Sequence, residues 1–466
     1  MKKVAYLSLG CDKNRVDMEN TLGRLSERGF RVVAAPEPAF ALIINTCGFI
    51  DLAKEESIET ILESIEARKQ GSYTIIAAVG CLVERYRTEL ADEIPEIDIW
   101  MGLEQVERLA GRLDELYEKH EKEASPDHLP ESSSVPSRQK KISCNNEVRH
   151  ITTPYHYSFL KIADGCSGGC SFCAIPLIKG PWCSRPLENL LEEARALEAA
   201  GVKELNLVAQ DTTAYGKDLS PDVELADLLE RILSETNIPW IRVLYAHPEH
   251  VNDRLIDLLA HEERLLRYLD LPLQHISGRI LSAMGRRTGR RQIEELLERL
   301  YSRVRGLILR TTLMTGFPGE TETEFQELLA FIEEGWFFWG AAFGFSPEEG
   351  TAAEKMEGRV EQSIADERAA AVYEVQREVT SRKLGGLVGE NLDVLVDGPW
   401  SPMIYEEDYA SEAEPNTEWT ARFRGQAVDV DGVVKLVGDA REGEFVKARV
   451  VESWDYDLDA RLIEEE

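Results

Sequence analysis

Residues 165–173 read Gly-Cys-Ser-Gly-Gly-Cys-Ser-Phe-Cys, and the centre of the chain is organised around this stretch. It brings three thiols together, those of Cys166, Cys170 and Cys173, at spacings of four and three residues. Thiolates this close are suited to a shared ion or cluster, and the glycines let the backbone loop around a bulky inorganic centre without side-chain clashes. Three thiolates leave one position of a four-iron cluster open, so that one iron can bind a substrate or cofactor.

A zinc knuckle with a distant fourth ligand is an alternative for the same thiols. We favour the cluster over zinc, because a zinc site would more usually pair two C-x2-C units. A structural disulfide fits less well still, since three thiols cannot all pair. The C-x3-C-x2-C pattern, with Phe172 directly before the third cysteine, resembles the radical SAM superfamily. This resemblance implies that the open iron chelates the amino and carboxylate groups of S-adenosylmethionine (SAM).

The chain has 466 residues, which suggests about three domains, and a formal net charge of −32. Such acidity argues against a large phosphate-binding surface, because nucleic-acid binders need Lys and Arg to displace counterions. It favours a basic partner, although a generally acidic proteome would produce the same charge. The start does not read as a signal peptide, and no apolar run is long enough to cross a membrane. We therefore expect a cytoplasmic protein with no membrane partner, whose eight cysteines suit metal binding better than disulfides.

Before residue 82 the same unit occurs three times, an apolar strand followed by a cysteine beside a glycine. The predicted strands are 4–9 before Gly10-Cys11, 41–46 before Cys47-Gly48, and 74–79 before Gly80-Cys81. Helical patterns separate them, so we predict an open parallel α/β sheet whose carboxyl strand ends share one edge. Cys11, Cys47 and Cys81 should therefore converge as a second three-thiolate site. Lone buried cysteines are common in protein cores, but the repeated placement favours a ligand set.

The remaining chain changes character twice. Residues 121–150 are rich in Pro and Ser without apolar periodicity and are predicted to be a linker, in which Cys144 is a free thiol. Repeated strand-then-helix patterns follow and predict a partial parallel (βα)6 barrel with its active site at the carboxyl strand ends. After residue 375, short β segments predict a small antiparallel barrel, and residues 391–466 hold seven basic and 20 acidic side chains. The predicted divisions are 1–120, 121–150, 151–375 and 380–466.

This order of domains resembles the radical SAM methylthiotransferase family over essentially the whole chain. The resemblance implies an α/β protein with an N-terminal methylthiotransferase domain, a central radical SAM barrel and a C-terminal TRAM barrel. It also implies two [4Fe-4S] clusters and SAM as cofactors. An auxiliary cluster would be held by Cys11, Cys47 and Cys81, and the SAM-binding cluster by Cys166, Cys170 and Cys173.

Three local runs resemble the branch of that family that modifies an aspartate of small-subunit ribosomal protein uS12. They are Leu-Gly-Cys-Asp-Lys-Asn-Arg-Val-Asp at 9–17, Leu-Lys-Ile-Ala-Asp-Gly-Cys at 160–166, and Ala-Gln-Asp-Thr-Thr-Ala-Tyr-Gly at 209–216. The tRNA-modifying branches usually lack the Gln-Asp-Thr run and tend to carry a basic TRAM domain. The acidic barrel here favours docking to a basic ribosomal protein, with tRNA an unlikely partner. At position 183 the family usually has Arg, and we interpret Cys183 as tolerated and not catalytic.

The resemblance implies the reaction as well. A radical made from SAM takes a hydrogen from the β-carbon of the target aspartate, sulfur comes from the auxiliary site, and a second SAM supplies the methyl group. The resemblance also implies an external electron donor and a sulfur source as partners. Gln210 and Asp211, at a predicted strand end, are candidates for the substrate or SAM pocket, or else ordinary polar strand-end residues. A tRNA methylthiotransferase acting on a modified adenosine, and a zinc-stabilised nucleic-acid-binding protein without chemistry, are the competing functions.

Overall fold

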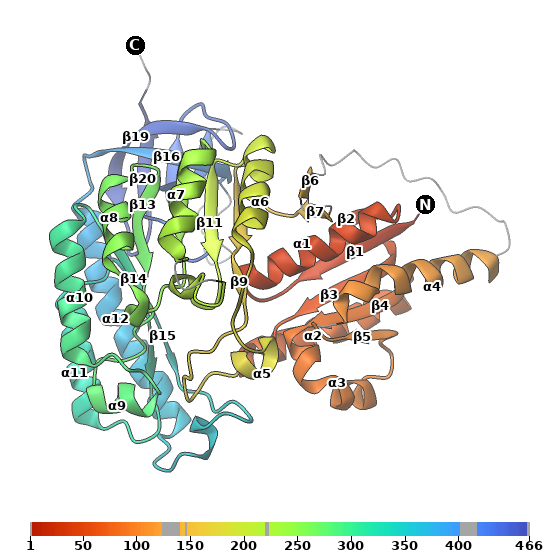
Figure 1. Cartoon of the computed structure of the whole chain (residues 1–466), viewed down its shortest axis with the longest axis horizontal. Helices are drawn as coiled ribbons and strands as arrows, with labels where there is room; N and C mark the ends of the chain where they lie inside the picture. The colour runs from red at the N-terminus through yellow and green to blue at the C-terminus, as the bar shows by residue number, and fades with distance from the viewer. Residues whose placement is uncertain are drawn as a thin grey trace.

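The computed structural model of the chain describes residues 2–103, 105–123, 140–144, 147–219, 223–400 and 417–463. Three units are visible in Figure 1, an N-terminal α/β domain in red and orange, a larger central domain and a small blue barrel. The predicted fold class, α/β with two parallel sheets and a small terminal barrel, is confirmed. In the described part of the chain, no helix is both long and apolar enough to span a bilayer.

The N-terminal domain is built on a five-stranded parallel sheet in the order β2-β1-β3-β4-β5. Its strands are β1 (Lys3–Ser8), β2 (Arg31–Ala34), β3 (Ala39–Thr46), β4 (Tyr73–Gly80) and β5 (Ile99–Met101). Its helices are α1 (Asp12–Glu27), α2 (Asp51–Lys69), α3 (Cys81–Glu93) and α4 (Leu109–Glu123), with a 3-10 turn at Val106–Arg108. Apolar side chains of α1 and α4 cover one face, and those of α2 and α3 cover the other. The three strands predicted from the sequence are therefore adjacent, as β1, β3 and β4.

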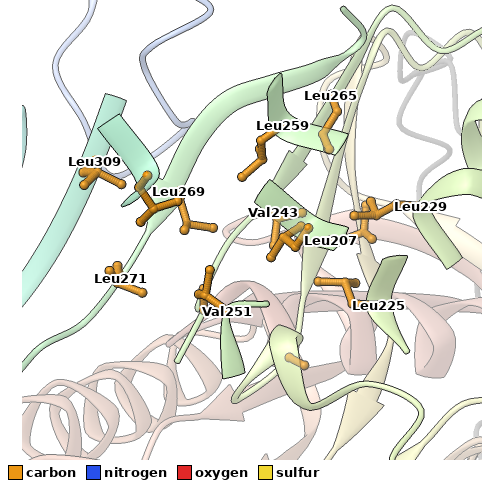
Figure 2. Close-up of a cluster of buried hydrophobic side chains, with 14 of the residues drawn as sticks. Leu207, Leu225, Leu229, Val243, Val251, Leu259, Leu265, Leu269, Leu271 and Leu309 are labelled. Atoms are coloured by element: carbon orange, nitrogen blue, oxygen red, sulfur yellow. The ribbon is translucent and has the colours of Figure 1, made fainter. Parts of the chain in front are cut away.

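The central domain has a six-stranded parallel sheet in which neighbours follow chain order. Its strands are β8 (Tyr157–Lys161), β11 (Glu204–Val208), β12 (Trp240–Val243), β13 (Leu265–Asp270), β14 (Ile308–Thr315) and β15 (Trp339–Gly344). Its helices are α5 (Ile175–Lys179), α6 (Leu187–Ala199), α7 (Leu225–Glu235), α8 (Asp253–His261), α9 (Gly278–Ala283), α10 (Arg290–Arg303), α11 (Glu322–Glu333) and α12 (Gln362–Gly385). Leucine and valine side chains from the strands pack against helices such as α7 and α8 in one continuous core (Figure 2). The six parallel strands of the predicted (βα)6 barrel are therefore present.

The stretch predicted to be a linker is partly structured. Strand β6 (Lys140–Cys144) pairs antiparallel with β7 (Glu147–Ile151), while residues 124–139 lie outside the described part of the chain. Arg149 of β7 is 1% exposed and lies between Glu19 of α1 and Glu193 of α6. The hairpin could not be predicted from apolar periodicity, because it is held in place by buried ion pairs. The side chain of Cys144, which was predicted to be a free thiol, lies outside the described part of the structure.

The C-terminal barrel closes in the order β16-β17-β18-β20-β19. Its strands are β16 (Asn391–Pro399), β17 (Glu418–Phe423), β18 (Val434–Val437), β19 (Phe445–Ser453) and β20 (Leu458–Leu462). The prediction of an antiparallel barrel is wrong in one pair, since β18 runs parallel to β20. Closing a barrel with an odd number of strands requires at least one parallel pair, which the sequence pattern did not reveal.

The loop after β17 joins the barrel to the other two domains. The indole of Trp339 donates to the Gly425 carbonyl at 2.6 Å, and the Tyr268 hydroxyl donates to Asp431 at 2.7 Å. Farther along, the Asp429 carboxylate lies 3.3 Å from the guanidinium of Arg15 on α1. The loop thus covers the face of the central sheet opposite the helices and contacts the N-terminal domain.

Candidate functional site

The first three cysteines lie where adjacent strands of the N-terminal sheet end. Cys11 follows β1 and precedes α1, Cys47 follows β3, and Cys81 is the first residue of α3 directly after β4. Because β1, β3 and β4 are neighbours and parallel, their carboxyl ends share one edge. The Cys81 thiol lies 3.4 Å from the side-chain oxygen of Asn14, and the Cys47 amide donates to Ser57 Oγ at 3.0 Å.

Glycines beside these cysteines let the three turns approach closely. A Cβ on Gly48 would lie 2.6 Å from Leu82 Cα, and one on Gly80 would lie 2.5 Å from the Thr46 carbonyl oxygen. Gly80 also has φ +102°, a conformation that side-chain-bearing residues rarely adopt. These positions therefore require glycine for steric reasons.

Gly80→Ala should destabilise the N-terminal domain and lower the iron content after reconstitution. Gly71→Ala is a matched control, since Gly71 has φ +88° and its Cβ would meet nothing within 4 Å. Both variants carry the cost of a left-handed backbone, about 1–2 kcal/mol. Gly80→Ala should cost about 1–3 kcal/mol more, because the Cβ overlaps backbone. Urea denaturation of both variants tests this, and equal destabilisation would contradict it.

The second three cysteines lie in the loop between the short strand β9 (Ala163–Asp164) and α5. The Cys166 amide donates to the Gly180 carbonyl at 3.1 Å, and the Gly168 amide approaches Cys166 Sγ at 3.3 Å. The Ser171 amide donates to the Met284 carbonyl at 2.9 Å, which fixes the middle of the loop against the end of α9. Backbone hydrogen bonds therefore shape this loop and leave its thiols free to bind a common centre.

Both sets of thiols line one cavity of about 360 Å³. It lies between the N-terminal and central domains, at the carboxyl ends of the strands. Its wall is formed by Cys11, Lys13, Asn14, Cys47, Phe49, Cys81, Cys166, Gly168, Cys170, Phe172, Cys173, Ile175, Ile178, Lys179, Gln210, Asp211, Tyr245, Ala246, His247, Pro272, Gln274 and Arg286. Cys183, exposed on the short strand β10 (Cys183–Ser184), does not line this cavity.

Polar contacts hold the two domains together around the cavity. Asp17 of α1 accepts from Lys179 at 2.8 Å and also pairs with Lys161. On the far side, Arg85 of α3 lies 2.7 Å from the buried carboxylate of Glu348. Buried charges that are paired in this way fix orientation, because separation would leave each of them uncompensated.

Burial controls the protonation of the thiols. It raises the pKa of Cys81 to about 11, against an opposing effect of Lys179, and raises the pKa of Cys173 to about 12. It also raises the pKa of Cys47 and of Cys166. Without a metal these thiols are therefore neutral near pH 7, and a bound cationic centre would deprotonate them.

The thiols of neither set form a tight single-ion site in the described structure. Four ligands about 2.3 Å from one zinc ion lie within about 4 Å of one another. In the described residues, only Asp211, His247 and His250 form a group of three ligand atoms all within 4.8 Å. Neither set of thiols is that tight, so neither presents a ready-made site for one zinc ion in the described structure.

Gln210 and Asp211 both line the cavity, in the loop after β11. Within the described structure, the buried Gln210 Oε1 has no hydrogen-bond partner. The Asp211 carboxylate has two, Thr213 Oγ1 at 2.6 Å and His250 Nδ1 at 2.6 Å. Burial and then Arg286 lower the pKa of the neighbouring His247 to about 3. Gln210 is thus available to a ligand, whereas Asp211 is engaged within the protein.

Sequence reasoning did not single out several residues of the wall, among them Lys13, Tyr245 and Gln274. The last two have positive φ angles, 60° and 73°, which are unusual for residues with side chains. Lys13 lies within the run 9–17 that carried the family resemblance, directly after Cys11-Asp12. No signal in a single sequence distinguishes such a lysine from a solvated one.

Comparison with protein families matches all three domains. Residues 3–102 match the uncharacterized protein family UPF0004, residues 160–332 match the radical SAM superfamily, and residues 388–463 match the TRAM domain. The seven cysteines with described side chains all fall within the first two matches.

Known relatives match over their full length. The ribosomal protein uS12 methylthiotransferase RimO of Syntrophotalea carbinolica is 38% identical, covering 100% of this chain and 97% of the relative. The RimO of Aquifex aeolicus is 40% identical, covering 98% and 97%. Among solved structures, the radical SAM methyltransferase TsrM from Kitasatospora setae, with cobalamin and a [4Fe-4S] cluster bound, has a TM-score of 0.53 at 14% identity. That match covers 74% of this chain and 72% of TsrM and shows a shared fold.

Proposed function

The chain belongs to the family of ribosomal protein uS12 methylthiotransferases, RimO, and from this premise we propose how its own residues carry out the reaction. It is a radical SAM transferase of sulfur-containing groups that uses SAM and a [4Fe-4S] cluster. The acceptor that we propose is the β-carbon of an aspartate of uS12. The observation that carries the proposal is that both sets of three thiols line a single cavity.

We assign Cys166, Cys170 and Cys173 to the cluster that binds SAM, and Cys11, Cys47 and Cys81 to an auxiliary [4Fe-4S] cluster. Three observations support the fit. Each set offers three thiols, the sulfurs are spaced more widely than single-ion ligands, and glycines keep the turns of the first set close. When bound and reduced, the SAM-binding cluster supplies the electron that cleaves SAM to a radical able to take hydrogen from an unactivated C–H bond.

The protein residues bind, orient and shield the reactants. Phe49, Phe172, Ile175 and Ile178 form an apolar part of the wall, which keeps water away from the reacting carbon. Three amide groups face the cavity with buried atoms that lack partners in the described structure, namely Asn14 Nδ2, Gln210 Oε1 and Gln274 Oε1. Because such atoms are costly to leave unpaired, we propose that they bind SAM or the substrate.

We propose that uS12 docks with the help of the acidic C-terminal barrel, since ribosomal proteins are basic and opposite charges steer association. The same acidity opposes tRNA, which would need a basic surface. The reaction consumes electrons and sulfur, so we propose an external electron donor and a sulfur source as further partners. Because the proposed substrate is a ribosomal protein, we propose that the enzyme acts in the cytoplasm.

Reconstituted enzyme, incubated with SAM, a reductant, sulfide and uS12, should add one methylthio group to a single aspartate. Mass spectrometry of uS12 peptides measures the product, and hypomodified tRNA in a parallel reaction should remain unchanged. Enzyme with Cys166→Ala is the control for adventitious chemistry. Modification of tRNA instead of uS12 would overturn the proposed substrate.

A further inference from the structure

Lys13 is a buried cation on the wall of the cavity. Its residue is only 6% exposed, and its Nζ lies 3.2 Å from the centroid of the Tyr245 ring. Throughout the described residues, no carboxylate lies within 4.0 Å of this Nζ. A lysine is almost never buried without an anionic partner, and the face of one aromatic ring compensates only part of the cost.

The neighbouring acidic group does not serve as that partner. The carboxylate of Asp12 accepts from the Tyr245 hydroxyl at 3.0 Å. Tyr245 itself has φ +60°, so an unusual backbone holds its ring beneath the ammonium group. The site is therefore built from both domains, with the cation on α1 and its aromatic support at the end of β12.

The other charged groups of the cavity are already engaged or lie elsewhere. Lys179 is paired with Asp17 at 2.8 Å, and Asp211 is paired with His250 at 2.6 Å. Arg286 lies beside the second set of thiols, because Gly285 packs directly against the backbone of Gly169. Lys13 is thus the cation on the side of Cys11 that lacks a protein anion in the described structure.

We propose that Lys13 binds the side-chain carboxylate of the target aspartate and thereby positions its β-carbon. This inference rests on the proposed function. A carboxylate that enters a partly apolar cavity needs a paired cation, and Lys13 is a buried cation that needs an anion. The β-carbon is one bond from the carboxylate, so anchoring that group confines the carbon near Cys11. An asparagine or an uncharged base would leave the ammonium unpaired, which makes Lys13 a specificity-determining residue.

A double-substitution experiment tests the pairing. The affinity of reconstituted enzyme is measured for uS12 and for uS12 whose target aspartate is asparagine, using wild-type enzyme and the Lys13→Met variant. With wild-type enzyme, the asparagine form should bind about 30-fold or more weakly, because a buried charge loses its partner. With Lys13→Met, both forms should bind equally weakly, within about threefold. Lys13→Arg keeps the charge and should restore a preference for aspartate.

Two results would overturn the assignment. One is a Lys13→Met variant that still prefers aspartate by the wild-type factor. The other is loss of iron together with loss of affinity for both forms of uS12, which would indicate a structural role. If wild-type enzyme fails to bind or modify uS12, the proposed function is overturned as well. The measurements on wild-type enzyme alone identify that outcome.

Discussion

Cys47→Ala should abolish methylthiolation of uS12 but leave reductive cleavage of SAM in place. Cys47 belongs to the N-terminal set of thiols, on the far side of the cavity from the set that we assign to the SAM-binding cluster. Loss of a metal ligand should cost more than the 10–100-fold typical of groups that merely orient ligands. The variant should therefore release 5′-deoxyadenosine from SAM, while methylthiolated uS12 falls by about 100-fold or more. Chromatography of the nucleoside and mass spectrometry of uS12 measure the two products.

Cys173→Ala should lose both activities, since no radical forms without the SAM-binding cluster. Cys183→Ala is the matched control, because this thiol is exposed on β10 and does not line the cavity. It should retain both activities and the wild-type iron content. If Cys47→Ala still methylthiolated uS12, the first set of thiols would not hold the sulfur that is transferred.

Among the substitutions of buried residues, Arg149→Met should lower the free energy of unfolding the most. Arg149 is 1% exposed, and its guanidinium donates to Glu19 at 2.6 Å and pairs with Glu193. Burial would raise the pKa of Glu193, but Arg185 and Arg149 lower it, so the carboxylate is charged. Removing the arginine leaves buried carboxylates uncompensated, at a cost of about 3–5 kcal/mol. Because these residues join α1, β7 and α6, the N-terminal domain should also detach more easily from the central domain.

Arg291→Met is the control for that substitution. Arg291 pairs with Glu295 at 2.7 Å, but its side chain is 90% exposed, and such pairs contribute about 0–1 kcal/mol. Urea denaturation monitored by circular dichroism compares the two variants with wild-type protein. Equal unfolding midpoints for all three proteins would show that the buried triad does not hold the domains together.

The three repeated units of the N-terminal domain could be predicted from the sequence, because each has an apolar strand that ends at a cysteine beside a glycine. The strands before Cys47 and Cys81 are almost wholly buried, and the strand before Cys11 is buried at Val4 and Ala5, so their shared edge followed from parallel-sheet geometry. Strands β2 and β5 were missed, since four and three residues carry too little periodicity. The hairpin containing Arg149 was missed because its anchors are charges on other segments, distant in sequence.

Residues of the cavity wall could be predicted from the sequence only where residue type and spacing indicate a chemical role. Closely spaced cysteines predict a metal site. Lys13, Tyr245 and Gln274 can be identified as cavity residues only from the structure, where the two domains meet. The packing of α1 against the central strand ends depends on pairs such as Asp17 with Lys179, 162 residues apart. Such contacts leave no local pattern in one sequence.

The central claim is that two incomplete iron–sulfur sites share one cavity. Electron paramagnetic resonance of the fully reduced, reconstituted enzyme tests it most directly. Variants that lack one thiol of one set, Cys47→Ala and Cys173→Ala, should each give the sharp spectrum of an isolated cluster. The wild-type spectrum should show splitting or broadening from the interaction of two nearby spins. A wild-type spectrum that equals the sum of the two variant spectra would contradict a shared cavity.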